Sequence, residues 1–133
     1  MAFILGMHPV LASERLIEIE HAFGGRVKRI IPLELDGETL RLVLYLKGGT
    51  NLRVTEQWHG RRLERYSYYW LTAANELRIG WDNAPHHSHL ENCPHHKHLG
   101  RNNSLEPSFE TSLEEVMPIV LIADPNALEE AEQ

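Results

Sequence analysis

Six of the nine histidines in this 133-residue chain lie close together, between Trp81 and His98. The segment contains Pro-His-His twice, with Asp82 near its start and Lys97 near its end. Imidazole titrates near neutral pH, so a histidine can transfer protons, bind a metal ion or, when protonated, contact a phosphate. We therefore expect the chemistry or the binding activity of the protein to reside in this segment.

The first interpretation of the segment is metal-independent cleavage of RNA. One imidazole would remove the proton of a ribose 2′-OH, and a second would protonate the leaving 5′ oxygen. Lys97, Arg78 or Arg101 would stabilise the negative charge that develops on the phosphate. Asp82 would orient one imidazole through its Nδ1–H. The candidate catalytic residues are His86, His87, His95, His96, Lys97, His98 and Asp82.

Two other interpretations remain open for the same segment. In one, it holds a divalent ion such as zinc, which accepts imidazole nitrogen and thiolate, and the protein is a binding module without catalysis. The donors would come from His86, His89, Cys93, His95 and His98, with His96 as a further candidate. Their spacing matches no standard zinc motif. In the other, the segment is a solvated loop without chemistry. The catalytic interpretation needs no cofactor.

Basic and aromatic residues are interleaved just before this segment. The combination suits RNA, because arginine contacts phosphates and aromatic rings stack on unpaired bases. The alternative is that the rings fill the core of a sheet, where aromatic residues are common. The candidate nucleic-acid-binding residues are Arg61, Arg62, Arg65, Tyr66, Tyr68 and Arg78.

Two helices are predicted to flank the part of the chain that holds these residues. Residues 9–23 have the spacing of an amphipathic helix, with Arg15 among the residues of its polar side. Ser13 is a candidate cap for a shorter version of this helix, and Gly24-Gly25 would end it. Residues 112–123 form the second predicted helix, capped by Thr111 or Ser112 with Glu114 or Glu115 as the capping-box partner. Pro118 predicts a kink or a restart in that helix.

Five runs of residues between the helices alternate with period two and are separated by turn signals such as Asp36-Gly37. The runs are 27–36, 39–47, 51–58, 63–71 and 76–81. They predict an α+β fold, in which a single antiparallel meander of about five strands carries the N-terminal and C-terminal helices. Residues 82–108 lack periodicity and are predicted to be a histidine-rich loop. Residues 124–133 form an acidic tail, and we expect one domain over 1–133.

The charge of the chain is unevenly distributed. Residues 105–133 contain eight acidic residues and no lysine or arginine, so a formal net charge of −6 leaves +2 on the first 104 residues. This distribution is compatible with nucleic acid as a partner but argues against binding driven by a large positive field. A single cysteine, Cys93, and the lack of a long apolar run favour a cytoplasmic protein without a membrane segment.

Three motifs together resemble a known family. They are Arg65-Tyr66-Ser67-Tyr68, then Trp81-Asp82-Asn83-Ala84-Pro85-His86-His87, then Pro94-His95-His96-Lys97-His98. The chain resembles the TumE toxins of prokaryotic toxin–antitoxin systems over about residues 10 to 122. The resemblance implies a growth-inhibiting toxin and a cognate antitoxin, expected to be a helix-turn-helix DNA-binding protein. RNA is the expected target, an endoribonuclease the expected activity, and a homodimer one expected assembly.

Overall fold

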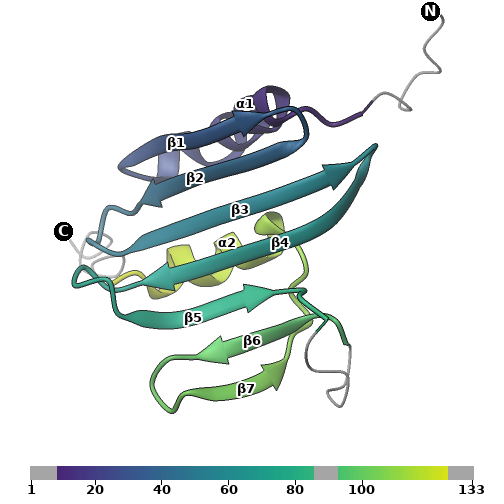
Figure 1. Cartoon of the computed structure of the whole chain (residues 1–133). Helices are drawn as coiled ribbons and strands as arrows, with labels where there is room; N and C mark the ends of the chain where they lie inside the picture. Colours follow the sequence, from purple (N-terminus) through teal and green to yellow (C-terminus); the bar gives the residue numbers. More distant parts are fainter. Residues whose placement is uncertain (1–8, 86–92, 126–133) are drawn as a thin grey trace, which may run out of the picture.

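The computed structural model describes residues 9–85 and 93–125, which form a seven-stranded antiparallel sheet with two helices on one face (Figure 1). The strands are hydrogen-bonded in chain order from β1 to β7. The elements are α1 (Ala12–Phe23), the 3₁₀ turn η1 (Gly24–Arg26), β1 (Arg29–Asp36), β2 (Thr39–Tyr45), β3 (Asn51–His59), β4 (Arg62–Leu71), β5 (Leu77–Asp82), β6 (His96–Leu99), β7 (Ser104–Pro107) and α2 (Leu113–Ala123). The predicted α+β class and antiparallel meander are confirmed.

The first five strands agree with the sequence patterns to within about two residues at each end. The predicted turns are present, and Gly37 and Gly60 have φ angles of 59° and 63°, a region that glycine adopts without steric cost. Period-two alternation therefore identifies the five longer strands of the sheet.

The predicted loop over 82–108 is wrong for its described part. Residues 96–99 and 104–107 form the hairpin of β6 and β7, and β6 pairs with β5. These strands have four residues each, too few to show a hydrophobic alternation. Backbone hydrogen bonds from β6 to β5 and from β7 to β6, rather than a side-chain pattern, place them in the sheet.

The helix termini show which caps form. α1 begins at Ala12, whose N–H donates to the Gly37 carbonyl at 2.7 Å, and Ser13 does not cap it. α2 is capped as predicted, since Ser112 Oγ accepts from the Glu115 N–H. The hydrogen bond from the Thr111 N–H lowers the pKa of Glu115. α2 runs unbroken through Pro118, so the predicted restart does not occur.

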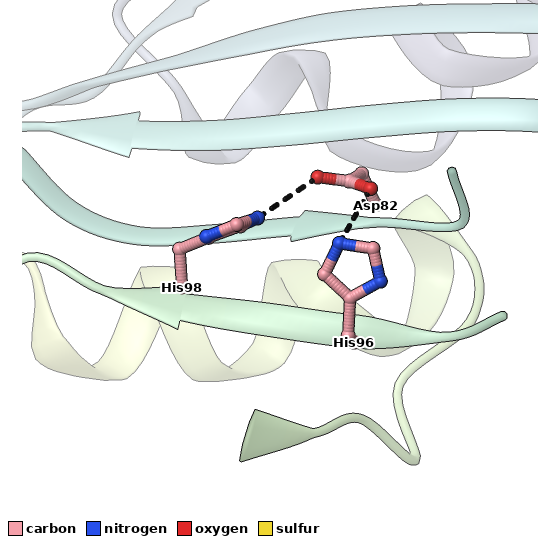
Figure 2. Close-up of side chains that lie close together, drawn as sticks. All are labelled: Asp82, His96 and His98. Atoms are coloured by element: carbon pink, nitrogen blue, oxygen red, sulfur yellow. Dashed lines mark ion pairs between the residues drawn. The ribbon is translucent and has the colours of Figure 1, made fainter. Parts of the chain in front are cut away.

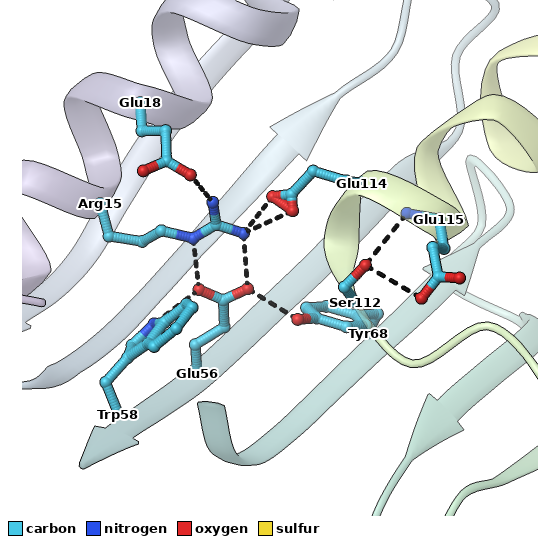
Figure 3. Close-up of polar contacts among 8 residues, drawn as sticks. All are labelled: Arg15, Glu18, Glu56, Trp58, Tyr68, Ser112, Glu114 and Glu115. Atoms are coloured by element: carbon cyan, nitrogen blue, oxygen red, sulfur yellow. Dashed lines mark hydrogen bonds and ion pairs between the residues drawn. The ribbon is translucent and has the colours of Figure 1, made fainter. Parts of the chain in front are cut away.

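A buried ion-pair network joins both helices to the sheet (Figure 3). Arg15 was expected on the polar side of its helix, but its side chain is 2% exposed and its Nε lies 2.7 Å from Glu56 Oε1. Its Nη2 lies 2.5 Å from Glu114 Oε1. Glu56 also accepts from Tyr68 Oη at 2.6 Å and Trp58 Nε1 at 3.0 Å. Burial lowers the pKa of Arg15, but the two carboxylates outweigh that effect and raise it above its ordinary value.

The two faces of the sheet differ in character. One face packs against α1 and α2 through buried side chains such as Leu42, Val54, Trp70 and Trp81. No described helix covers the other face, which we call the open face (Figure 1). Neither helix is long and apolar enough to cross a bilayer, among the residues described.

Candidate functional site

Two neighbouring strands bring an aspartate and two histidines together on the open face (Figure 2). Asp82 of β5 lies directly opposite His96 of β6, and His98 is two residues further along the same strand. Alternate residues of a strand share a face, so all three side chains project to the same side. His96 Nε2 lies 2.8 Å from Asp82 Oδ1, and His98 Nε2 lies 3.3 Å from Asp82 Oδ2. We call these three residues the Asp-His-His centre.

Hydrogen bonds from the sheet hold the carboxylate of the centre in place. Asp82 Oδ1 accepts from the Ala84 N–H at 3.0 Å, and Oδ2 accepts from Tyr69 Oη at 3.2 Å. Tyr69 can reach it because its ring lies across Gly80, where a Cβ would come within 2.5 Å of the ring. Burial and the charge of Asp82 raise the pKa of Tyr69. The local sequence Gly80-Trp81-Asp82 thus leaves room for the tyrosine that positions the carboxylate.

The two imidazoles differ in exposure. The His96 side chain is 3% exposed, and its Nδ1 lies 2.9 Å from the Pro94 carbonyl oxygen. The His98 side chain is 35% exposed and meets the His96 ring edge-on, with 5.0 Å between the ring centroids. His96 is therefore an enclosed member of the centre, and His98 is the one that a substrate can reach.

Two residues predicted to act with these histidines lie on the opposite face of β6 or beside it. Lys97 pairs with Trp81 on the helix side, and its Nζ lies 3.6 Å from Glu110 Oε1. His95 Nδ1 lies 2.9 Å from Tyr66 Oη, and the two rings stack. Burial lowers the pKa of His95. The prediction that Lys97 would lie beside the imidazoles is wrong, because strand alternation turns it away.

Those remaining members of the predicted sets that the structure describes are not brought to the centre. His86, His87 and His89 lie outside the described residues. Cys93 is exposed. The predicted zinc set that combined His95 with His98 is not assembled, since His95 contacts Tyr66 on the helix side and His98 contacts Asp82 on the open face. Asp82 and His96 complete a different set with His98.

The predicted nucleic-acid-binding residues are divided between several places. Tyr66 and Tyr68 are buried beneath the helices, so they offer no ring to a base, and the core interpretation holds for them. Burial raises the pKa of both hydroxyls. The Arg78 guanidinium lies 4.1 Å from the centroid of the Trp70 ring. Arg61 and Arg62 are exposed at the turn between β3 and β4, and Arg65 is exposed beside the Asp-His-His centre.

The open face is hollowed along its length. A cavity of about 500 Å³ is lined by Thr55, Arg65, Tyr69 and the Asp-His-His centre, among others. A second cavity of about 390 Å³ shares Thr55 and includes Arg41 and Arg53. Arg41 is not among the predicted nucleic-acid-binding residues. The one sequence signal that could have placed it on this face is its alternation with the leucines of β2. The centre thus lies at one end of a concave strip with three exposed arginines.

The chain matches the family model described as Toxin TumE over residues 21–125. No curated protein and no solved structure matches it. The matched range contains all seven strands, the whole of α2 and the whole Asp-His-His centre.

Proposed function

The chain belongs to the TumE toxin family, and from this premise we propose that it inhibits growth by cleaving RNA at the Asp-His-His centre. It is the toxin of a toxin–antitoxin system and its partner is an antitoxin. We further propose that this antitoxin is a helix-turn-helix DNA-binding protein.

The observation that carries the cleavage proposal is the placement of the centre on an open, basic sheet face. In the proposed reaction the 2′ oxygen bonds to phosphorus as its proton leaves. The P–O5′ bond breaks, and a proton is delivered to the 5′ oxygen. The products are a 2′,3′-cyclic phosphate and a 5′-hydroxyl, so no oxidant, reductant or other co-reactant is consumed. The centre must therefore accept one proton and return one, which imidazole and carboxylate groups can do.

Exposure and contacts indicate which residues of the open face would meet the RNA. His98 can reach an RNA strand in the cavity, whereas His96 is enclosed between Asp82 and the Pro94 carbonyl. Arg65 lines the same cavity and would stabilise the charge on the phosphate, the role first expected of Lys97. Arg41 and Arg53 would contact phosphates further along the strand.

Induced expression of the chain should stop growth and fragment cellular RNA, whereas His98→Ala should restore growth and leave RNA intact. The reason is that His98 is the exposed imidazole of the centre. Growth curves and RNA electrophoresis measure both effects, and purified protein with a labelled RNA checks the cleavage directly.

His59→Ala is the matched control, because His59 is exposed at the end of β3 and belongs to no part of the centre. It should behave as the wild type. Growth arrest with intact RNA, or equal cleavage by His98→Ala, would rule out the proposed reaction.

Arg65→Ala should weaken RNA binding and make it less sensitive to salt. Each lost phosphate contact reduces the slope of log K against log[salt] by about 0.7 for a single strand. Fluorescence anisotropy with a labelled oligoribonucleotide at several salt concentrations measures the slope. Arg26→Ala, an exposed arginine in η1, should leave the slope unchanged. An equal loss in both variants would contradict the assignment of the open face.

A further inference from the structure

We infer that Asp82, His96 and His98 bind one zinc-type divalent metal ion. This set differs from the one that the sequence suggested, since it includes Asp82 and His96 and omits His95 and Cys93. Binding of the ion is argued from geometry alone, whereas its part in RNA cleavage rests on the proposed function.

The first argument is the spacing of the donor atoms. One ligand atom from each of the three residues lies within 4.8 Å of the others. His96 Nε2 lies 2.8 Å from Asp82 Oδ1, and His98 Nε2 lies 3.3 Å from the other oxygen, Asp82 Oδ2. Zinc–nitrogen and zinc–oxygen bonds of about 2.0–2.2 Å in a tetrahedron place neighbouring ligand atoms about 3.3–3.5 Å apart. Small side-chain movements would therefore bring all three donors onto one ion.

The second argument is the orientation of the His96 ring. Its Nδ1 lies 2.9 Å from the Pro94 carbonyl oxygen, which accepts a hydrogen bond from it. Its Nε2 faces Asp82 Oδ1 from 2.8 Å and is therefore the ring atom that would bind the ion. Metal-binding histidines usually donate their other ring N–H to a carbonyl or carboxylate in this way.

The third argument is that three protein ligands would leave one coordination position of the ion open. Two imidazoles and one carboxylate make up the ligand set of many catalytic zinc sites, with water or substrate in the fourth position. Imidazole nitrogen favours zinc and its transition-metal neighbours over magnesium, which prefers oxygen ligands. The cavity on the open face provides access to the fourth position. An ion there would polarise a phosphoryl oxygen of bound RNA, and water at its open position would exchange the protons that the coordinated imidazoles no longer can.

The test uses the full chain, purified without a histidine tag and stripped with a chelator. Titration with Zn²⁺ against a chromophoric chelator should give one ion per chain, and Co²⁺ should give the strong visible absorption of a low-coordinate site. Mg²⁺ should leave the melting temperature unchanged, whereas Zn²⁺ should raise it. His98→Ala and Asp82→Asn should each weaken Zn²⁺ binding by at least about 100-fold. The first removes a ligand and the second replaces an anionic ligand with a neutral amide, and both are larger changes than losing an outer hydrogen bond. His59→Ala should bind as the wild type.

Circular dichroism of each variant shows whether it is folded, and His98→Ala is the informative one because its side chain is partly exposed. Zinc bound equally well by both centre variants would place the ion elsewhere and overturn the inference. So would the absence of binding by the wild type. If the wild type binds no ion but cleaves RNA in a chelator, this inference fails and the proposed function stands. If it binds zinc at the centre but leaves RNA intact, the proposed function fails and the metal site stands.

Discussion

Glu56→Ala is expected to lower the free energy of unfolding by about 3–5 kcal/mol, the usual loss when one partner of a buried ion pair is removed. Glu56 is fully buried and accepts from Arg15, Tyr68 and Trp58 (Figure 3). Removing its carboxylate takes an acceptor from two buried donors, Arg15 and Tyr68, and from the half-buried Trp58. Urea denaturation followed by circular dichroism measures the change.

The control for this prediction is Glu64→Ala, which removes an exposed carboxylate from the neighbouring strand β4. It should change stability by no more than about 0.5 kcal/mol. A double variant, Arg15→Met with Glu56→Leu, should be more stable than Glu56→Ala, because it removes the charges together and replaces them with apolar volume. A loss below about 1 kcal/mol for Glu56→Ala would show that the network is not a stabilising link between helices and sheet.

This network shows how far sequence patterns reach and where they stop. The alternation of Leu52, Val54 and Glu56 already places the glutamate on the apolar face of its strand. What the pattern cannot supply is the partner, because Arg15 lies 41 residues earlier on a helix whose periodicity assigns it to the polar side. Only the docking of α1 on the sheet brings the two charges together. Local periodicity thus predicts elements and faces, but not long-range pairs of polar groups.

The Asp-His-His centre shows the same limit of local sequence patterns. The density of histidines predicts the right segment, and Asp82 was expected to orient an imidazole. Without periodicity the segment is predicted to be a loop, however, so the sequence does not distinguish His96 and His98 from Lys97. Once β6 is known to be a strand paired with β5, alternation alone separates them, and the register sets Asp82 opposite His96. The missing information was the pairing of a four-residue strand, which depends on its neighbour more than on its own sequence.

Strand alternation and helix docking together also decide which aromatic residues of β4 are buried. Alternation along the strand puts Tyr66, Tyr68 and Trp70 on one side, with Arg65 and Tyr69 on the other. The sequence did not show which side the helices cover. Because α1 and α2 cover the side with Tyr68 and Trp70, the arginine and Tyr69 are the ones left beside the centre. The buried rings therefore cannot stack on bases, and the nucleic-acid proposal concerns the open face alone.

Asp82→Asn is expected to reduce RNA cleavage by at least about 10²-fold, the lower end of what a positioned proton transfer contributes. The substitution preserves the size of the side chain but removes its charge and one acceptor oxygen. Asp82 lies within 3.3 Å of donors from Ala84, Tyr69, His96 and His98, and it uses both of its oxygens. An amide has one oxygen, so its NH₂ group must face at least one of these donors. Single-turnover cleavage of a labelled oligoribonucleotide measures the loss.

Two further measurements separate a chemical role of Asp82 from a structural one. The affinity for RNA should remain within about twofold of the wild type, since phosphate contacts from the open-face arginines govern binding. Asp36→Asn makes the same chemical change at an exposed hairpin position and should cleave at the wild-type rate. If Asp82→Asn loses RNA affinity and cleavage together, the aspartate shapes the open face rather than the reaction. If it cleaves normally, the reaction takes place elsewhere, because every residue of the centre is held through this one carboxylate.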